Sequence, residues 1–187
     1  SLDVSQNAVL DYLYCPYNQL TSLDVSQNAV LDYLYCPYNQ LTSINTNGAD
    51  AIETLHCGNN QLTSIDVSQN VNLGSLQCYD NQLTCLNVAN GNNTDMALYA
   101  ENNPDLTCIE VDNYIWATSN WLGEVDPQTS FSEDCNNDCT SNLTELSTSK
   151  NLIQILDMMG RETSFKPNTP LIYVYDDGSI EKVFSVE

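Results

Sequence analysis

A period of 21 residues constrains the fold of this chain more than any other feature of its sequence. Residues 1–21 and 22–42 are identical letter for letter. A repeat of this length is typical of a solenoid, in which each unit forms one turn and buries its apolar side against the neighbouring turns. Two residue types keep this spacing over four units, namely Cys15, Cys36, Cys57 and Cys78, and Asn18, Asn39, Asn60 and Asn81. We therefore predict a mainly β solenoid over residues 1–112.

Each unit contains one clear strand signal. In the first unit Leu13 and Cys15 point inward and Tyr14 points outward, which is the alternation of a half-buried strand. Stacked units then pair these strands into a parallel sheet. Asn18 follows the strand where the backbone turns, and its amide can bond to peptide groups of its own and the neighbouring turn. Residues 20–25 return the chain along the opposite wall, and we expect extended or turn structure there.

The unit reads L-x-x-L-x-C-x-x-N-x-L and resembles the leucine-rich repeat, L-x-x-L-x-L-x-x-N/C-x-L. The resemblance implies short parallel strands on a concave face that recognises a ligand. The cysteine ladder, defined as Cys15, Cys36, Cys57 and Cys78, is similar to that of internalin-like leucine-rich repeat proteins, where it implies core packing. Buried free cysteine behaves as a small apolar side chain, and thiols stacked in one line do not converge on a metal ion. We expect no metal site in this ladder.

The residues that alternate with the core form the candidate binding surface on the concave face. Six tyrosines of this set cluster on the first two turns. Tyrosine offers contact area and a hydroxyl at low entropic cost, which favours recognition of protein or glycan. The alternative is that cross-strand aromatic pairs only stabilise the sheet. The set comprises Tyr12, Tyr14, Tyr17, Tyr33, Tyr35, Tyr38, His56, Gln77 and Tyr99.

The charge of the chain excludes some partners. The chain has 25 acidic and 4 basic residues, and every basic residue lies at or beyond Lys150. Nucleic acid and anionic membranes are bound through Lys and Arg, so we expect neither as a partner of the repeats. Asp24 and Asp66 recur at one outward position and could share calcium. A solvated acidic face is the preferred interpretation because the Gly-rich calcium repeat is absent, and we expect no cofactor.

After Asn90 the repeat slips, and residues 113–135 no longer follow it. This segment contains Trp116 and Trp121. Large apolar rings just beyond the last turn predict a cap that covers the exposed end of the core.

Four further cysteines lie outside the cysteine ladder: Cys85, Cys108, Cys135 and Cys139. In an exported protein they can oxidise. We predict a Cys108–Cys135 disulfide, which would join the cap to the solenoid, and a Cys85–Cys139 bond would complete this scheme. The main alternative is Cys85–Cys108, because these two residues lie on adjacent turns.

Residues 136–149 are rich in Asn, Thr, Ser and Asp and are predicted to be a linker. Residues 150–187 then form a tail that we expect to be a small antiparallel β-unit. Its apolar segments are 152–159, 171–175 and 180–186, the last two joined by the hairpin signal Asp176-Asp177-Gly178-Ser179.

The tail resembles the C-terminal sorting domain of type IX (Por) secretion in Gram-negative bacteria. The resemblance rests on LIQILDMMGRE, on PLIYVYDDGSIEK and on the C-terminal position. The PNP-containing strand and G-x-Y motif of commoner members are missing, so the tail is similar to a shorter variant. The resemblance implies contact with the secretion machinery, transport across the outer membrane and removal of the tail. An extracellular or outer-surface location follows, and no apolar run is long enough to span a bilayer.

Our leading functional hypothesis is a secreted or surface-displayed binding and adhesion module. The alternative is a spacer or stalk for a functional domain upstream, because Ser1 begins in mid-repeat and the array is expected to be truncated at this end. We expect no enzymatic activity and no catalytic residues. His56 is the single histidine, and the sequence contains neither a nucleophile elbow nor a phosphate loop.

Overall fold

The computed structural model describes residues 2–136, 139, 152–157, 161–163, 170–175 and 180–184. The chain divides into two compact units, Ser1–Ser141 and Asn142–Glu187. The division falls within the predicted linker 136–149 rather than at residue 150. Cys139, the described residue nearest this boundary, belongs to the first unit, where it is buried and disulfide-bonded to Cys85. Residues 140–149 lie outside the described part of the chain.

The first unit is a parallel β-solenoid, as the period predicts. One wall is a five-stranded sheet made of β1 (Tyr12–Tyr14), β3 (Tyr33–Tyr35), β5 (Thr54–His56), β7 (Ser75–Gln77) and β9 (Ala97–Tyr99). The return segments form a second row of strands: β2 (Ser22–Asp24), β4 (Ser43–Asn45), β6 (Ser64–Asp66), β8 (Cys85–Asn87), β10 (Cys108–Glu110) and β11 (Ser130–Ser132). In this row β2 pairs with β4, and β6, β8, β10 and β11 form a four-stranded sheet.

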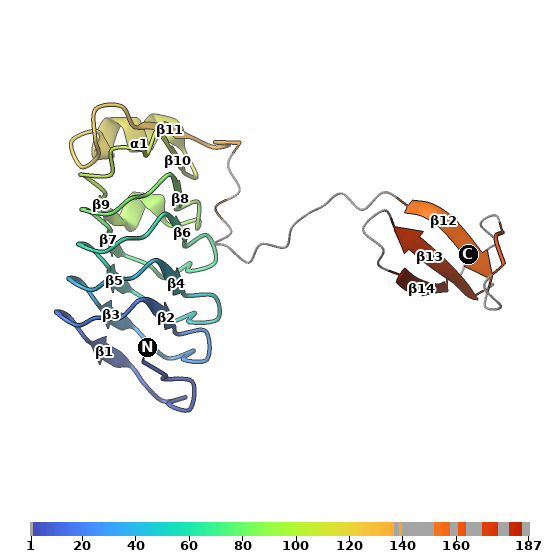
Figure 1. Cartoon of the computed structure of the whole chain (residues 1–187). Coiled ribbons are helices and arrows are strands. Elements are labelled where there is room, and N and C mark those ends of the chain that lie inside the picture. The colour runs from blue at the N-terminus through green and yellow to red at the C-terminus, as the bar shows by residue number, and fades with distance from the viewer. Residues whose placement is uncertain are drawn as a thin grey trace. The chain divides into compact units, whose positions relative to one another are not determined.

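The two rows of strands run along opposite walls of the coil (Figure 1). Equivalent residues of successive turns lie opposite one another, as Leu13 lies opposite Leu34 and Leu34 opposite Leu55. This register follows from the strict period, because a slip by one residue would expose the apolar side chains. The predicted concave face therefore corresponds to the outer face of the five-stranded sheet.

The apolar core fills the space between the two rows. Its most buried side chains include Leu34, Leu41, Leu55, Leu62, Leu76 and Leu83. The cysteine ladder also lies in this core, and its four thiols are free. Burial raises the pKa of Cys36, Cys57 and Cys78 above the ordinary thiol value, so these thiols remain protonated and pack as small apolar groups.

Asparagine amides join successive turns at three of the four predicted positions, whereas Asn18 on the first turn donates only within its own turn. The side-chain nitrogen of Asn39 donates to the carbonyls of Cys15 at 3.0 Å and Cys36 at 3.1 Å. Its side-chain oxygen accepts from the backbone N–H of Leu20 at 3.1 Å. The same pattern recurs at Asn60, Asn81 and Asn103. Asn103 had not been predicted, because the slipped frame hides its equivalence to the other members.

A second set of buried asparagines follows the second-row strands and had not been predicted. The side-chain nitrogen of Asn70 donates to the carbonyls of Thr46 and Ala49, and its oxygen accepts from the Thr46 hydroxyl at 2.8 Å. Asn28 donates in the same way, to the carbonyls of Val4 and Asn7. Its oxygen, however, is buried without a hydrogen-bond partner. The reason is that Val4 occupies the position that Thr46 holds two turns later.

The segment predicted as a cap lies at the C-terminal end of the coil (Figure 1). It contains the helix α1 (Tyr114–Trp121), which begins where the Asn113 side chain accepts from the backbone N–H of Trp116. Trp121 is buried and meets Trp116 edge to face at 5.2 Å. The helix itself had not been predicted, because its eight residues carry little amphipathic periodicity. A short 3₁₀ helix, Asn93–Asp95, accommodates the slipped repeat.

Two disulfides join the cap region to the solenoid, Cys108–Cys135 and Cys85–Cys139. The first is the favoured prediction, and the second completes the same scheme. The alternative Cys85–Cys108 pairing is wrong. Although β8 and β10 are neighbours, Cys85 and Cys108 each bond to a cysteine that follows β11.

The second unit is a three-stranded antiparallel sheet in the order β12 (Leu152–Asp157), β13 (Pro170–Tyr175) and β14 (Ile180–Phe184). The expected antiparallel β-unit is therefore present. The predicted hairpin turn, residues 176–179, and residues 158–160 at the end of the first predicted strand lie outside the described residues.

Candidate binding face

Six tyrosines form three stacked pairs on the outer face of the five-stranded sheet. The rings of Tyr12 and Tyr33 lie 4.6 Å apart, those of Tyr14 and Tyr35 4.8 Å apart, and those of Tyr17 and Tyr38 4.6 Å apart, each pair within 6° of parallel. These spacings equal the distance between neighbouring strands, because the register places like residues opposite one another. We call Tyr12, Tyr14, Tyr17, Tyr33, Tyr35 and Tyr38 the tyrosine ladder. Each ring covers one face of its partner, and Tyr12, Tyr14, Tyr17 and Tyr38 remain 52%, 59%, 75% and 45% exposed, so the ladder presents ring surface as well as hydroxyls to solvent.

Two members of the ladder have an unfavourable backbone conformation. Tyr17 and Tyr38 have φ values of 54° and 55°, in the left-handed region. This conformation costs most L-residues about 1–2 kcal/mol, whereas Asn and Asp tolerate it through local hydrogen bonds. The later turns use tolerant residues at this position: Asn59, Asp80 and Asn102. Backbone geometry therefore does not account for the two tyrosines.

His56 lies on the predicted face but is covered by its neighbours. Its imidazole is 7% exposed and meets the Tyr35 ring edge to face at 4.5 Å. A hydrogen bond of 3.0 Å joins its Nε2 to the hydroxyl of Tyr79. Burial lowers the pKa of His56 below its ordinary value, so the ring is neutral at physiological pH. His56 therefore positions Tyr79 more than it offers contact area of its own.

The position of Tyr79 depends on a glycine one turn earlier. A Cβ atom at Gly58 would lie 3.0 Å from Cζ of Tyr79, so the ring occupies the space that a side chain at residue 58 would need. The first two turns have Pro16 and Pro37 at the equivalent position. Sequence reasoning missed Tyr79, and the available signal was the change from proline to glycine one turn before a tyrosine.

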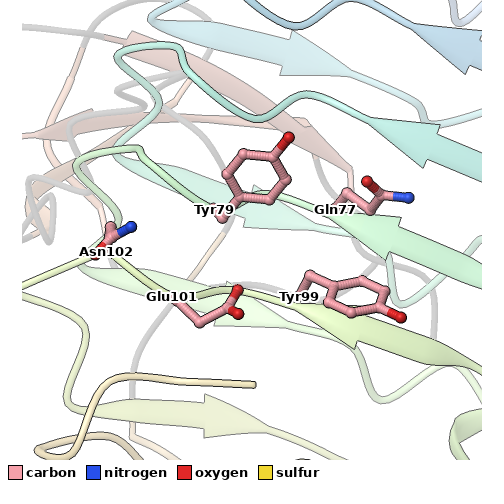
Figure 2. A pocket seen from close by; sticks show the side chains of 5 residues that line it. All are labelled: Gln77, Tyr79, Tyr99, Glu101 and Asn102. Atoms are coloured by element: carbon pink, nitrogen blue, oxygen red, sulfur yellow. The ribbon is translucent and has the colours of Figure 1, made fainter. Parts of the chain in front are cut away.

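An open pocket of about 510 Å³ adjoins this part of the face. It is lined by Gln77, Tyr79, Tyr99, Glu101 and Asn102 (Figure 2). In Figure 2 the Glu101 carboxylate lies below the Tyr79 ring and beside Tyr99. Gln77 and Tyr99 had been predicted as binding residues, whereas Tyr79 and Glu101 had not. Each lies two residues after the end of its strand, β7 or β9, at a position that holds Pro16 and Pro37 in the first two turns. The repeat therefore gave no aromatic or acidic pattern at this position.

The electrostatic character of the face is acidic and phenolic. Asp11, Asp32 and Glu53 are exposed at the position just before the β1, β3 and β5 strands, one carboxylate per turn. The solenoid sequence up to residue 141 contains no Lys or Arg that could neutralise them. Burial raises the pKa of Tyr33 and Tyr35, with smaller contributions from neighbouring tyrosines, so these phenols are protonated at neutral pH. The face can therefore donate and accept hydrogen bonds and attract cations.

Asp24, Asp66 and Glu110 lie at one outward position of the second row of strands, and side-chain amides donate hydrogen bonds to two of these carboxylates. Asn45 donates to the carboxylate of Asp24 at 3.2 Å, and Asn87 donates to that of Glu110 at 3.3 Å. Amides thus alternate with acids and reduce their mutual repulsion. Within the described part of the chain, no three His, Cys, Asp or Glu side chains form a group that could hold a metal ion.

Seven of the nine predicted binding residues lie on strands of the five-stranded sheet, and Tyr17 and Tyr38 lie three residues after the ends of β1 and β3. The ladder occupies its first two turns, His56 the third, and Gln77 and Tyr99 the fourth and fifth. Comparison of the chain with known protein families, curated proteins and solved structures found no match.

Proposed function

We propose that the solenoid is a leucine-rich repeat binding and adhesion module that recognises protein or glycan through the outer face of its five-stranded sheet. The observation that carries this proposal is the conformation of Tyr17 and Tyr38. Both rings stand at positions where a smaller polar residue would cost less, and they are 75% and 45% exposed. Stacking recovers part of this cost, about 0.5–1.5 kcal/mol for an aromatic pair.

A spacer or stalk would not need this arrangement. The third to fifth turns keep the same coil with Asn59, Asp80 and Asn102 at the left-handed position. Turns without a ladder tyrosine there are thus compatible with the fold. Exposed rings held at an energetic cost favour a contact surface over a purely structural role.

The substitution Tyr38→Asn tests this proposal, because it introduces the residue that the third turn carries at the same position. We expect the free energy of unfolding to stay level or rise by about 1 kcal/mol as backbone strain is relieved. We expect binding to weaken roughly tenfold, the usual scale for loss of an aromatic anchor. The labelled full chain would be tested against cells, surface proteins and polysaccharides.

Tyr114→Ala is the matched control, since Tyr114 is also about half exposed but lies on α1 of the cap, away from the face. Binding should be unchanged in this variant. Equal binding by the wild-type chain and Tyr38→Asn, with both folded, would contradict a role for the ladder in recognition.

We further propose that the tail, residues 150–187, is a type IX sorting signal, which would direct the protein to the outer cell surface or the medium. Two findings support this. The described part of the tail is an antiparallel sheet, and the first unit carries disulfides that fit an oxidising compartment. No helix among the described residues has the length and apolarity to cross a bilayer. Deletion of residues 150–187 should retain the protein inside the outer membrane of a host with this secretion system. Normal secretion of the truncated chain would refute the sorting role.

A further inference from the structure

The pocket differs from the tyrosine ladder in the aromatic surface that it exposes. In the ladder, parallel rings 4.6–4.8 Å apart cover one another. Tyr79 instead packs over Gly58 and against His56, and its ring also lines the pocket. Tyr99 has Gln77 as its neighbour in register rather than another ring. Ring surface of Tyr79 and Tyr99 thus adjoins the pocket.

The polar groups of the pocket select for positive charge. Glu101 supplies a carboxylate, and Gln77 and Asn102 supply amide oxygens that can accept hydrogen bonds. Asp80 adds a second carboxylate nearby, since both Asp80 and Glu101 contribute to the raised pKa of Tyr79, after burial and the neighbouring tyrosines. The solenoid contains no Lys or Arg to occupy this site from within. The charge of Glu101 and Asp80 disfavours an anion there.

We propose that this pocket binds the ammonium or guanidinium group of a lysine or arginine side chain, presented by a protein partner that lies along the tyrosine ladder. This inference rests on the proposed binding function of the face and assigns it a ligand chemistry. A cation beside tyrosine rings gains from their negative faces, and an adjacent carboxylate adds a charge-assisted hydrogen bond. The volume of about 510 Å³ lies within the usual range of ligand pockets.

A polypeptide fits this face better than a sugar chain. Neutral sugars offer no positive charge, whereas the pocket and the strands beside the ladder present carboxylates without Lys or Arg in the solenoid to neutralise them. The exposed carboxylates of Asp11, Asp32 and Glu53 flank the same strands, so further basic residues of the partner would meet a complementary column. The partner is therefore a basic segment of a protein.

The test uses a fluorescein-labelled peptide of twelve residues in which lysine alternates with glycine. Binding to the full chain would be measured by fluorescence anisotropy. Glu101→Gln should weaken binding about tenfold, because it removes the carboxylate from a partly desolvated cation site. Glu133→Gln is the matched control, an identical change of charge at an exposed residue of the cap, and should weaken binding less than about twofold. The peptide with acetylated lysines should not bind.

Three results would overturn the inference. Equal weakening by Glu101→Gln and Glu133→Gln would mean that peptide binding depends on the net charge of the chain and not on the pocket. Absence of lysine-peptide binding would remove the cation site. Tighter binding of a chitosan hexamer than of the peptide would assign the pocket to amino-glycans instead.

The variant Tyr38→Asn separates this inference from the proposal for the tyrosine ladder. Loss of binding in Tyr38→Asn but not in Glu101→Gln refutes the pocket alone. Loss of binding in Glu101→Gln but not in Tyr38→Asn refutes the ladder alone.

Discussion

Residues 1–21 and 22–42 have the same sequence but different environments. Leu13 is partly exposed, whereas its equivalent Leu34 is fully buried. Cys15 is 9% exposed and Cys36 is 0% exposed. The difference arises because the second copy is covered by a turn on each side, and the first is covered on one side within this chain. Burial in a solenoid is thus conferred by the neighbouring turns rather than by the local sequence.

The C-terminal end of the coil is covered differently. There the cap places α1 and β11 against the last turns, and Trp121 and Phe131 join the core. The two disulfides attach this cap region to β8 and β10. The non-repeating cap is thus held to the core by disulfides and large aromatic side chains, whereas a regular turn is held by the register of its strand with the neighbouring turns.

The largest expected effect concerns this dependence on covalent bonds. Replacement of both Cys108 and Cys135 by serine should lower the free energy of unfolding by about 3.5 kcal/mol, because the loop between them gains chain entropy when unfolded. Urea unfolding followed by tryptophan fluorescence would report the loss, since Trp116 and Trp121 lie in the cap. In a reducing buffer the gap between variant and wild type should disappear. A gap that persists there would attribute the loss to packing instead.

The identical copies permit a direct test of the neighbour effect. Asn39→Ala should destabilise the chain by about 3 kcal/mol, because it leaves buried carbonyls and the N–H of Leu20 without partners. Asn18→Ala, in the same local sequence, should cost about 1 kcal/mol, because Asn18 donates only within its own turn. Equal losses in urea unfolding would show that the asparagine acts locally and that the bonds between turns contribute little.

A smaller effect, opposite in sign between the two copies, is expected at Val4 and Val25. Val4→Thr should stabilise the chain by about 1 kcal/mol, since the new hydroxyl can donate to the unpartnered oxygen of Asn28 as Thr46 does to Asn70. Val25→Thr should destabilise it by about 1–3 kcal/mol, because Ala49 stands where that acceptor would be. The two melting curves should therefore shift in opposite directions. A shift of both in the same direction would mean that the hydroxyls find other partners.

Much of the solenoid could be predicted because its fold depends on one periodic property, the alternation of inward and outward side chains. The period alone predicted the register, the cysteine ladder and the asparagines that join the turns. It could not predict contacts that depend on two different turns at once. Tyr79 packs over Gly58 and holds His56, and the pocket forms where Tyr99 meets Gln77 rather than another ring. Such contacts depend on departures from the repeat, and a periodic pattern does not show which departures bring two side chains together.

The third and fourth turns provide the last and smallest test, because they place His56 and Gln77 opposite each other in the same sheet. Burial against Tyr35 and Tyr79 lowers the pKa of His56 from its ordinary value of 6.5, so the folded chain binds this proton more weakly than the unfolded chain. The stability that neutral His56 contributes is complete above pH 6.5 and is lost as the pH falls through the lowered pKa. His56→Gln should therefore lose less stability than the wild type between about pH 7.5 and pH 5.5, a window above the usual carboxylate pKa values. Urea midpoints at the two pH values would measure this difference, and identical declines in both proteins would show that the ring is equally accessible to protons in the folded and unfolded chain.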